Sequence, residues 1–512
     1  MSVPDRFNIA RYCLEPCAPR DPGKVAMIVV HNAAHDVADA EYWTYVQIDD
    51  AVRRIAAGIR TKGLPSGARI MIRMGNTSDY ALLYFGILAA GYVALPSSAQ
   101  LTQSEAAFLL EDSSASVIAV ADDLTVDHVP AGVVVWGPED TAALKAHEPQ
   151  EGFADTAAVD PAFLVYTSGT NGKPKGVLHA HRSVWGRRPM YQGWYGINAA
   201  DRLLHAGAFN WTYTLGVGLT DPWANGATSI LYNGAKDIGV WPKLIQDHKA
   251  TIMAAVPTLY RQVLKHCDLS RFDLSSLRHG LTAGEPLPLP VAEEWKARTG
   301  TSLYEALGMS ECSTYISCSP SVPVRPGSPG KPQAGRKVAI LPQDGGAEPL
   351  PPGEVGLLAV HRSDPGLMLH YWNRPDEDAE VFRGDWFVGG DLAEMDADGY
   401  VWFHGRDDDV MTSMGYRVSP AEVEAALAPH PDIAEVAVTE VPVRDGVRII
   451  TAFVVPAEGH GVDRDSVLAL AAEKLAAYKR PRAVVVLESL PRTGNGKVRR
   501  NDLKGLAALP DK

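Results

Sequence analysis

Hydrophobic and polar residues follow two different periods along the first part of the chain. Residues 46–60 carry an apolar stripe at helical spacing, residues 68–74 read as a strand, and residues 78–90 predict an apolar helix that ends near Gly91. Further strand-like runs, each followed by a turn or a helix signal, lie at 163–166, 251–256, 277–282 and 301–306. Strands that alternate with helices predict parallel sheets whose faces are covered by helices.

The pattern changes after a segment at 319–335 that is dense in proline and glycine. Shorter strand-like runs then alternate with Gly, Asp and Pro turns, which indicates a small β-rich part; they lie at 338–341, 355–360 and 400–403. Beyond 405–409 (GRDDD) the pattern changes again, starting with a helix signal at Ser419. Strand-like runs at 435–441, 448–455 and 483–487 and a helix near 465–477 predict a separate α+β domain.

The composition is that of a globular protein. Hydrophobic residues make up 46% and charged residues 21% of 512 residues, a length that suits three or four domains at about 150 residues each. The formal net charge of −13, with no long basic run, argues against a duplex nucleic-acid partner. No membrane span and no secretory signal are expected, so the sequence predicts a cytoplasmic protein.

The cysteines give no sign of a metal or redox site. They are five in number and form no C-x-x-C pair: Cys13, Cys17, Cys267, Cys312 and Cys318. The sequence also lacks the H-E-x-x-H pattern of helical zinc hydrolases. We expect reduced, buried thiols.

The loop at 166–176 (YTSGTNGKPKG) carries the strongest chemical signal. Its small residues let backbone N–H groups approach an anion, as in a phosphate cradle, and its polar groups come from Thr167, Ser168, Thr170, Lys173 and Lys175. It is not a Walker A loop, because position 167 is Thr where that pattern has Gly, and position 174 is Pro where it has Ser or Thr. The alternative is a solvated surface turn with incidental lysines.

The eleven-residue string as a whole resembles the adenylate-forming superfamily of acyl-CoA synthetases, adenylation domains and luciferases. Five further segments resemble motifs of that family in the same order: 280–286 (GLTAGEP), 307–311 (LGMSE), 386–391 (WFVGGD), 405–408 (GRDD) and 491–497 (PRTGNGK). Together the six segments cover nearly the full chain. Among the branches of the family, the resemblance is greatest to benzoate-type aryl-acid CoA ligases.

The resemblance implies an α/β fold with two domains and a hinge. The expected N-terminal domain covers residues 1–406, with two helix-covered sheets and a small β-barrel-like part at about 327–405. The expected mobile C-terminal domain covers residues 407–512. Because Lys497 lies far from its partners in sequence, the two domains must close together, and Asp408 would be the pivot.

The resemblance also implies a role for each motif. Catalysis would depend on Lys497, Glu311 and Thr167, with Glu311 holding Mg²⁺. ATP and AMP would contact Thr167, Ser168, Gly169, Thr170, Lys175, Gly284, Glu285, Pro286, Leu307, Gly308, Ser310, Asp391 and Arg406. Coenzyme A, the expected thiol co-substrate, would contact Gly415, Tyr416 and Arg417.

Several positions depart from the family pattern. After the hinge, Thr412 stands where a lysine is common and Met414 where a serine is common, so that loop lacks the lysine that makes an ionic contact in relatives. Leu307 replaces an aromatic residue that often stacks on adenine, and Gly389 replaces a threonine of the ribose motif.

The acid is predicted from the segment 208–216 (AFNWTYTLG). Asn210 carries no charge where amino-acid-adenylating relatives have an aspartate, which disfavours an α-amino acid. The resemblance places the acyl pocket at Asn210, Trp211, Tyr213, Ala283 and Gly308 and favours a benzoate-like or hydroxycinnamate acid. Aromatic residues at helical spacing are more often core than ligand contacts, so a small or medium-chain acid stays open.

Three functions remain as hypotheses. The first is a carboxylic acid–CoA ligase that forms acyl-CoA, AMP and pyrophosphate through an acyl-adenylate. The sequence favours it because only fifteen residues follow Lys497, which leaves no room for a carrier domain. The others are a stand-alone enzyme that loads a carrier protein and a nucleotide-binding protein without chemistry. We expect His179 and His181 to be packing and hydrogen-bonding residues at a helix start, and a homodimer is possible.

Overall fold

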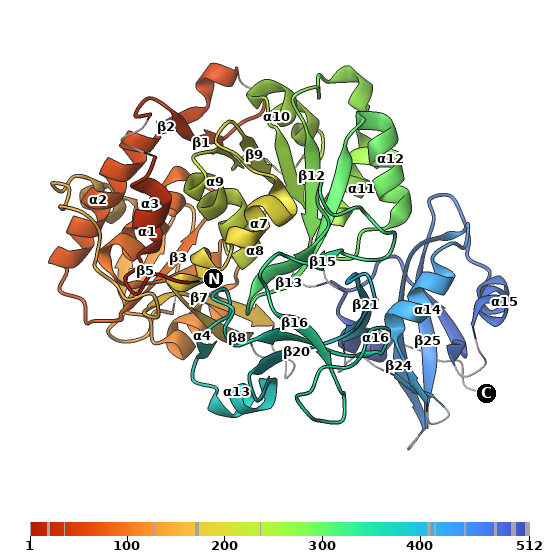
Figure 1. Cartoon of the computed structure of the whole chain (residues 1–512). Coiled ribbons are helices and arrows are strands. Elements are labelled where there is room, and N and C mark those ends of the chain that lie inside the picture. Colours follow the sequence, from red (N-terminus) through yellow and green to blue (C-terminus); the bar gives the residue numbers. More distant parts are fainter. Residues whose placement is uncertain are drawn as a thin grey trace. The chain divides into compact units, whose positions relative to one another are not determined.

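The computed structural model describes most of the chain (Figure 1). The described residues are 2–17, 21–34, 36–126, 128–168, 174–235, 237–406, 411–413, 416–444, 447–475, 479–492 and 498–506. The chain divides into two compact units, one formed by residues 1–338 and 360–387 and the other by residues 339–359 and 388–512. The predicted boundary after residue 406 adjoins residues 407–410, which lie outside the described residues, so it stays a prediction.

The first unit contains a seven-stranded sheet in the order β18-β8-β7-β4-β3-β5-β6. Its central strands pair in parallel, whereas β8 pairs antiparallel with both β7 and β18. The strands are β3 (Arg69–Met74), β4 (Val93–Ser98), β5 (Val117–Val120), β6 (Val134–Trp136), β7 (Pro161–Ser168), β8 (Pro174–Ala180) and β18 (His370–Tyr371). The segment 166–176, which the sequence predicts to bind phosphate and which is called the phosphate loop below, therefore begins in β7 and ends in β8.

Helices cover both faces of this sheet, as the alternating pattern predicts. Apolar residues of α4 (Gln103–Ser113) pack on one face, and α2 (Tyr45–Thr61) and α3 (Ser78–Ala90) pack on the other. Both α2 and α4 begin with a capping box, Thr44 with Gln47 and Thr102 with Glu105, which satisfies backbone N–H groups of the first turn. A shorter helix, α5 (Pro138–Lys145), begins with a proline at its first turn.

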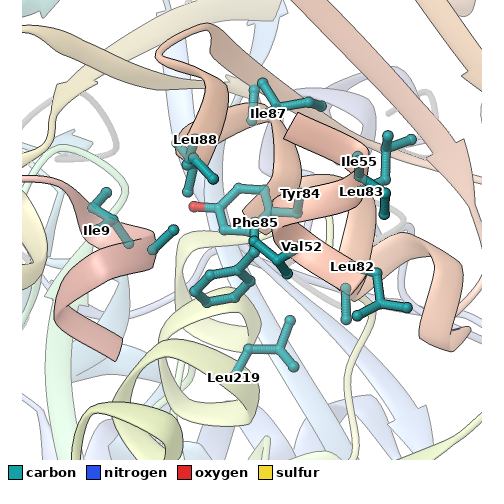
Figure 2. Packing of buried hydrophobic residues seen from close by; sticks show 14 of the residues in the cluster. Ile9, Val52, Ile55, Leu82, Leu83, Tyr84, Phe85, Ile87, Leu88 and Leu219 are labelled. Carbon is teal, nitrogen blue, oxygen red and sulfur yellow. The ribbon is translucent and has the colours of Figure 1, made fainter. Parts of the chain in front are cut away.

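Helix α3 is apolar on all sides, which predicts burial on all sides. Figure 2 shows its residues Leu82–Leu88 between Ile9 of α1 (Ile9–Leu14), Val52 and Ile55 of α2, and Leu219. The same cluster includes side chains from the strands of both large sheets of the unit. Helix α3 therefore belongs to the core that the two sheets share.

The second large sheet has nine strands in the order β15-β14-β13-β12-β11-β9-β10-β1-β2. Six consecutive strands pair in parallel, from β13 to β1, so their carboxyl ends lie at one edge. They are β1 (Val25–Val30), β9 (Arg202–His205), β10 (Thr228–Tyr232), β11 (Ile252–Ala255), β12 (His279–Ala283) and β13 (Ser302–Met309). The antiparallel edge strands are β2 (Glu41–Thr44), β14 (Ser313–Ser317) and β15 (Lys331–Pro332).

Two different layers cover this sheet. One face packs against three amphipathic helices, α10 (Val240–His248), α11 (Pro257–His266) and α12 (Leu289–Thr299) (Figure 1). The other face packs against short helical segments, the π-helices η2 (Tyr191–Tyr195) and η3 (Gly216–Thr220). Neighbouring short helices are α6 (Arg182–Trp185), α7 (Arg188–Met190), α8 (Thr212–Leu215) and α9 (Asp221–Ala224). The first unit also contains α13 (Pro375–Val381) and β19 (Phe382–Arg383).

The second unit contains the predicted β-rich strands and the α+β elements. Its first strands are β16 (Val338–Leu341), β17 (Gly356–His361), β20 (Trp386–Met395) and β21 (Val401–Arg406), the last two paired antiparallel. A two-stranded ribbon, β22 (Met411–Ser413) and β23 (Tyr416–Val418), precedes a three-stranded sheet of β24 (Ile433–Arg444), β25 (Val447–Pro456) and β26 (Ala483–Val486). The helices are α14 (Pro420–Leu427), α15 (Arg464–Lys474) and α16 (Arg500–Leu506).

Four of the five thiols are buried as expected, Cys13, Cys267, Cys312 and Cys318, whereas Cys17 is half-buried. Among the helices that the structure describes, none combines the length and the apolar character needed to cross a bilayer.

Candidate active site

The phosphate-loop residues begin at the paired ends of β7 and β8. Thr167 lies opposite Lys175 and Ser168 opposite Pro174 in the antiparallel register. Directly opposed residues share one face of the sheet, so Thr167 and Lys175 lie side by side. The predicted residues Gly169 and Thr170, with Lys173, lie outside the described residues.

Lys175 is held by groups that come from much later in the chain. Its Nζ atom lies 3.8 Å from the ring centre of Tyr371 and 3.3 Å from a carboxylate oxygen of Glu377. Tyr371 belongs to β18, which pairs with β8 through Tyr371 and Val177. The hydroxyl of Tyr371 also donates a 2.7 Å hydrogen bond to Glu311. Tyr371 thus connects the phosphate-loop lysine with the predicted metal ligand.

Ser310 and Glu311 form the turn between β13 and β14. Met368 donates its backbone N–H to the carbonyl of Glu311 over 2.7 Å, and His179 contributes a 2.9 Å hydrogen bond from Nε2 to the carbonyl of Ser310. Burial lowers the pKa of His179 to about 4, so the neutral ring donates to this carbonyl. The turn that carries Glu311 is therefore fixed from two sides.

Gly308 is required where β13 passes closest to β14. A Cβ atom on Gly308 would lie 2.5 Å from the carbonyl oxygen of Ser313 and 2.6 Å from the Cα atom of Thr314. These are backbone atoms, so any side chain would force the two strands apart. The sequence reasoning assigned Gly308 to nucleotide and acyl contacts, and the structure adds a packing reason for the glycine.

The segment predicted to contact adenine follows β12 at the carboxyl edge of the nine-stranded sheet. Gly284 has a φ of 93°, a left-handed conformation that favours glycine. The hydroxyl of Thr258 donates a 2.7 Å hydrogen bond to Glu285. Because Ala283 pairs with Ala306 in parallel register, the segment 284–286 lies beside Leu307 and Gly308.

A buried ion pair lies next to the Glu311 turn. Arg187 contacts Asp221 at 2.6 Å, Tyr195 donates its hydroxyl to the same carboxylate, and Arg187 also donates to the hydroxyl of Ser313. Burial alone would lower the pKa of Arg187, but the carboxylate of Asp221 outweighs it and the pKa is raised. The pair connects the start of β14 to α9.

The predicted acyl residues are only partly brought together. Tyr213 of α8 packs against a cluster that contains Ala283 and Ala306. Its ring stacks on Trp194, with ring centres 6.0 Å apart, and meets the ring of His205 edge-on at 4.7 Å. Asn210 and Trp211 are half-buried and precede this helix.

The two residues of the second unit that are predicted to bind the nucleotide are cross-strand neighbours. Asp391 of β20 pairs with Arg406 of β21, and their side chains approach to 3.3 Å. Arg406 also donates to the carbonyl of Gly389 over 2.8 Å. Asp391 is buried, so its carboxylate is oriented by this neighbour.

Several predicted residues cannot be located. Asp408, Gly415 and Lys497 lie outside the described residues. Tyr416 and Arg417 are in β23, where they pair with Ser413 and Thr412, but only their backbones are described.

Sequence reasoning missed Tyr371, Trp194 and His205 and misjudged one local structure. His179 lies in β8 and stacks on Phe163 at 4.7 Å, so the prediction of a helix start was wrong for it. Its predicted role in packing and hydrogen bonding is confirmed, as is that of His181, whose Nδ1 accepts from the N–H of Ile9 over 3.3 Å. No local pattern pointed to Tyr371, since its place in the site depends on strand pairing across almost 200 residues.

Comparison with known proteins agrees with this arrangement. Residues 14–372 match the family described as "AMP-binding enzyme", and residues 422–497 match "AMP-binding enzyme C-terminal domain". The chain is 31% identical over 482 residues to an uncharacterized acyl–CoA ligase of Bacillus subtilis, covering 91% of this chain and 90% of that protein. It is 29% identical over 493 residues to the 3-hydroxybenzoate–CoA ligase of Aromatoleum sp., covering 92% of each.

A solved structure is similar over almost the whole length. The crystal structure of an anthranilate CoA ligase in complex with anthranoyl-AMP superposes with a TM-score of 0.89 at 28% identity, covering 99% of this chain and 98% of that chain. Since the two family matches follow one another in the expected order and the first alone spans most of the chain, this protein belongs to the AMP-binding enzyme family.

Proposed function

We propose that the carboxylic acid activated by this ATP-dependent acid–CoA ligase is aromatic, a benzoate-like or hydroxycinnamate acid. In the first half-reaction a carboxylate oxygen attacks the α-phosphorus of ATP, which forms the acyl-adenylate and releases pyrophosphate. In the second, the thiol sulfur of coenzyme A attacks the acyl carbon, AMP leaves, and the thiol proton is released. The adenylate provides the leaving group that a free carboxylate lacks.

In this proposal the residues of the first unit bind the triphosphate. Thr167, Ser168 and Lys175, with Gly169 and Thr170, hold the departing pyrophosphate, and the segments 284–286 and 307–310 bind adenine and phosphate. The contacts of Lys175 with Tyr371 and Glu377 support a cationic group held in position for an anion.

The carboxylate of Glu311 fits Mg²⁺, because hard cations prefer oxygen ligands and the Tyr371 hydrogen bond orients this carboxylate. When bound, Mg²⁺ neutralises charge on the phosphate oxygens. The proposal assigns to Glu311 the binding of that ion. It assigns to Ser310 a phosphate contact, which the fixed turn supports.

The remaining roles follow the resemblance. Asp391 and Arg406 bind the ribose and phosphate, which their pairing across β20 and β21 supports. Lys497 neutralises charge during adenylate formation. Rotation about Asp408 then brings Gly415, Tyr416 and Arg417 to coenzyme A for the second half-reaction.

One observation carries the proposal for the acid. Tyr213 packs on the cluster that contains Ala283 and Ala306, so an aromatic ring lies at the place where the resemblance puts the acyl pocket. A flat acid beside this ring gains ring contacts of about 0.5–1.5 kcal/mol beyond area burial. A flexible chain loses in addition roughly 0.5–1.5 kcal/mol for each rotamer-rich group that becomes ordered. The names of the hydroxybenzoate and anthranilate ligases support the same class.

The test is ATP–pyrophosphate exchange with a panel of acids, followed by thioester formation with and without coenzyme A. Benzoate and coumarate should exceed butyrate and octanoate by about tenfold or more in kcat/KM. If octanoate or butyrate is the better substrate, the second candidate, a small or medium-chain acyl-CoA synthetase, replaces the first. Exchange that never leads to acyl-CoA would instead favour an enzyme that loads a carrier protein.

Trp211→Ala tests whether Trp211 lines the acyl pocket. If Trp211 lines the acyl site, the variant should accept bulkier acids while the KM for ATP stays near the wild-type value. An unchanged acid profile would assign Trp211 to the core.

A homodimer and a cytoplasmic location are also part of the proposal. Light scattering of the purified chain tests the first, and fractionation of its host cells tests the second.

A further inference from the structure

A buried histidine lies beside Tyr213 of the proposed acyl site. His205 is the last residue of β9, 3% exposed, and pairs in register with Ala254 of β11, which in turn pairs with Leu281 of β12. Residues in register on parallel strands point to the same side, so His205 shares the face of Ala254 and Leu281. Ala283, two residues beyond Leu281, lies on that face too. Tyr213 lies against His205 at 4.7 Å.

Three polar side chains in this place have no hydrogen-bond partner. Within the described part of the chain, both ring nitrogens of His205, the hydroxyl of Tyr213 and the hydroxyl of Thr214 are buried and unpaired. An unpaired buried polar group costs free energy, so such groups are rare and need an explanation. Three neighbouring side chains with unpaired polar atoms indicate a place for a hydrogen-bonding group of a ligand.

Two of the unpaired groups lie together beside Gly207. A Cβ atom built on Gly207 would lie 2.7 Å from His205 Cε1, 3.1 Å from His205 Nδ1 and 2.7 Å from the hydroxyl oxygen of Thr214, so the ring and the hydroxyl both lie against this glycine. The two polar atoms are therefore close enough to each other for one small polar group to form a hydrogen bond with both. A hydroxyl suits them well, because it donates one hydrogen bond and accepts others.

His205 is neutral in this environment. Burial lowers its pKa to about 3, so the ring offers one N–H donor and one nitrogen acceptor at neutral pH. A neutral ring pairs with a hydroxyl or an amino group, but it gives no charge to balance a second carboxylate.

We propose that the acid of this ligase carries a neutral hydrogen-bonding substituent, a hydroxyl or an amino group on the aromatic ring, and that His205 with Thr214 and Tyr213 selects it. This inference rests on the proposed function, since it concerns the same acyl site. His205 is then a specificity-determining residue, and the unpaired groups form their hydrogen bonds when the acid is bound.

The test compares kcat/KM in pyrophosphate exchange for benzoate, the three monohydroxybenzoates, 2-aminobenzoate and benzene-1,3-dicarboxylate. At least one hydroxy or amino acid should exceed benzoate by about tenfold or more, because a site built to hydrogen-bond a substrate group discriminates against the analogue without it. The dicarboxylate should be the poorest substrate.

His205→Phe should reduce that ratio to about twofold or less, because the ring shape is kept and the donor and acceptor are lost. The matched control is His248→Phe. His248 is also buried with an unpaired nitrogen, but it ends α10 before the start of β11, at the opposite edge of the sheet from His205. This control should keep the wild-type ratio. If His205→Phe does not fold, Tyr213→Phe and Thr214→Val make the same comparison.

Each result has a separate meaning. If no acid supports exchange or thioester formation, the proposed function fails. If the acids react but benzoate equals or exceeds every substituted acid, the inference about the substituent is overturned while the proposed function stands. If the preference exists and persists in His205→Phe, Tyr213→Phe and Thr214→Val, the assignment of these residues is overturned. The melting temperature of free His205→Phe should not fall, since the variant removes an unpaired buried group.

Discussion

The hydroxyl oxygen of Tyr371 lies 2.7 Å from Oε1 of Glu311, and the ring of Tyr371 lies under the ammonium of Lys175. One side chain of β18 therefore orients the proposed metal ligand and positions a phosphate-loop cation. Both contacts are made by side chains of the chain itself, so the fold holds Glu311 and Lys175 in place. Such preorganisation is the main way in which a protein accelerates phosphoryl-type transfer.

Tyr371→Phe should raise the Mg²⁺ concentration for half-maximal pyrophosphate exchange by about threefold to tenfold. The variant removes a hydrogen bond to a charged group but keeps the ring beneath Lys175. Titration of Mg²⁺ at saturating ATP measures the effect. The same Mg²⁺ dependence in variant and wild type would show that the hydroxyl does not position Glu311.

Gly308→Ala should lower pyrophosphate exchange by about tenfold or more, because β13 and β14 must move apart and a displacement of about 1 Å is enough to misplace Ser310 and Glu311. The matched control is Gly461→Ala, where a Cβ atom would meet open space. The control should keep full activity. If Gly308→Ala is equally active, the turn tolerates the shift.

Asp221→Asn should destabilise the protein by about 3–5 kcal/mol, because it leaves the guanidinium of Arg187 buried without its counter-charge. Chemical denaturation followed by tryptophan fluorescence measures the loss. Asp273→Asn is the control, since Asp273 pairs with Lys249 on the surface and its loss should hardly change the midpoint. Equal midpoints for the two variants would contradict the structural role of the buried pair.

The folded protein should lose stability as the pH falls from about 6.5 toward 4. Burial lowers the pKa of His179 and His181 to about 4, so the unfolded chain binds protons in this window while the folded protein does not. Their contribution is complete above the unfolded pKa of about 6.5 and falls by about 1.4 kcal/mol per pH unit for each histidine. His181→Asn keeps an acceptor for the N–H of Ile9. In this variant about one proton fewer should be taken up on unfolding, so the free energy of unfolding should depend less steeply on pH. An unchanged slope in unfolding experiments at pH 4.5–7 would contradict the prediction.

Lys497→Ala should abolish formation of the acyl-adenylate and leave thioester formation from a supplied acyl-adenylate nearly intact. The reason is the proposed use of Lys497 in one domain orientation only, during charge development at the α-phosphate. Pyrophosphate exchange and a single-turnover thioesterification measure the two halves separately. Equal loss of both would contradict a role confined to the first half-reaction.

The fold class and the family could be predicted from the sequence because their signals are local. The strand at 163–166, the apolar helix at 78–90 and the strands near 252, 279 and 302 all lie within a residue or a few of their predicted bounds. Length was harder to predict: β24 and β25 extend beyond the predicted runs, since strand pairing lengthens both partners. The sequence predicts a helix start at His179 because His179 follows the phosphate loop, but the pairing of β8 with β7 continues to Ala180 and the helix begins only at Arg182.

Residues of the site could be predicted only where they belong to a recognisable sequence motif. Glu311 and Asp391 lie in recognisable strings, whereas Tyr371 reaches Glu311 through the register of β18 on β8. His205 and Trp194 can be assigned to the proposed acyl site only from the structure, because both contact the ring of Tyr213. Contacts of this kind depend on long-range pairing, which a single sequence does not encode in any short window.

The apolar helix α3 has a consequence for how this protein is made. Its residues leave the ribosome about 130 residues before Leu219, one of the side chains that cover it, which corresponds to roughly 7–26 seconds at the usual rate of synthesis. During that time a helix that is apolar on every side lacks Leu219 and the other later side chains of its cluster, and its partners from the preceding chain come from α1, α2, β1 and β3. Newly made chains should therefore engage holdase chaperones at this stage, and ribosome-bound chains that end between residues 120 and 210 should be the most prone to aggregate.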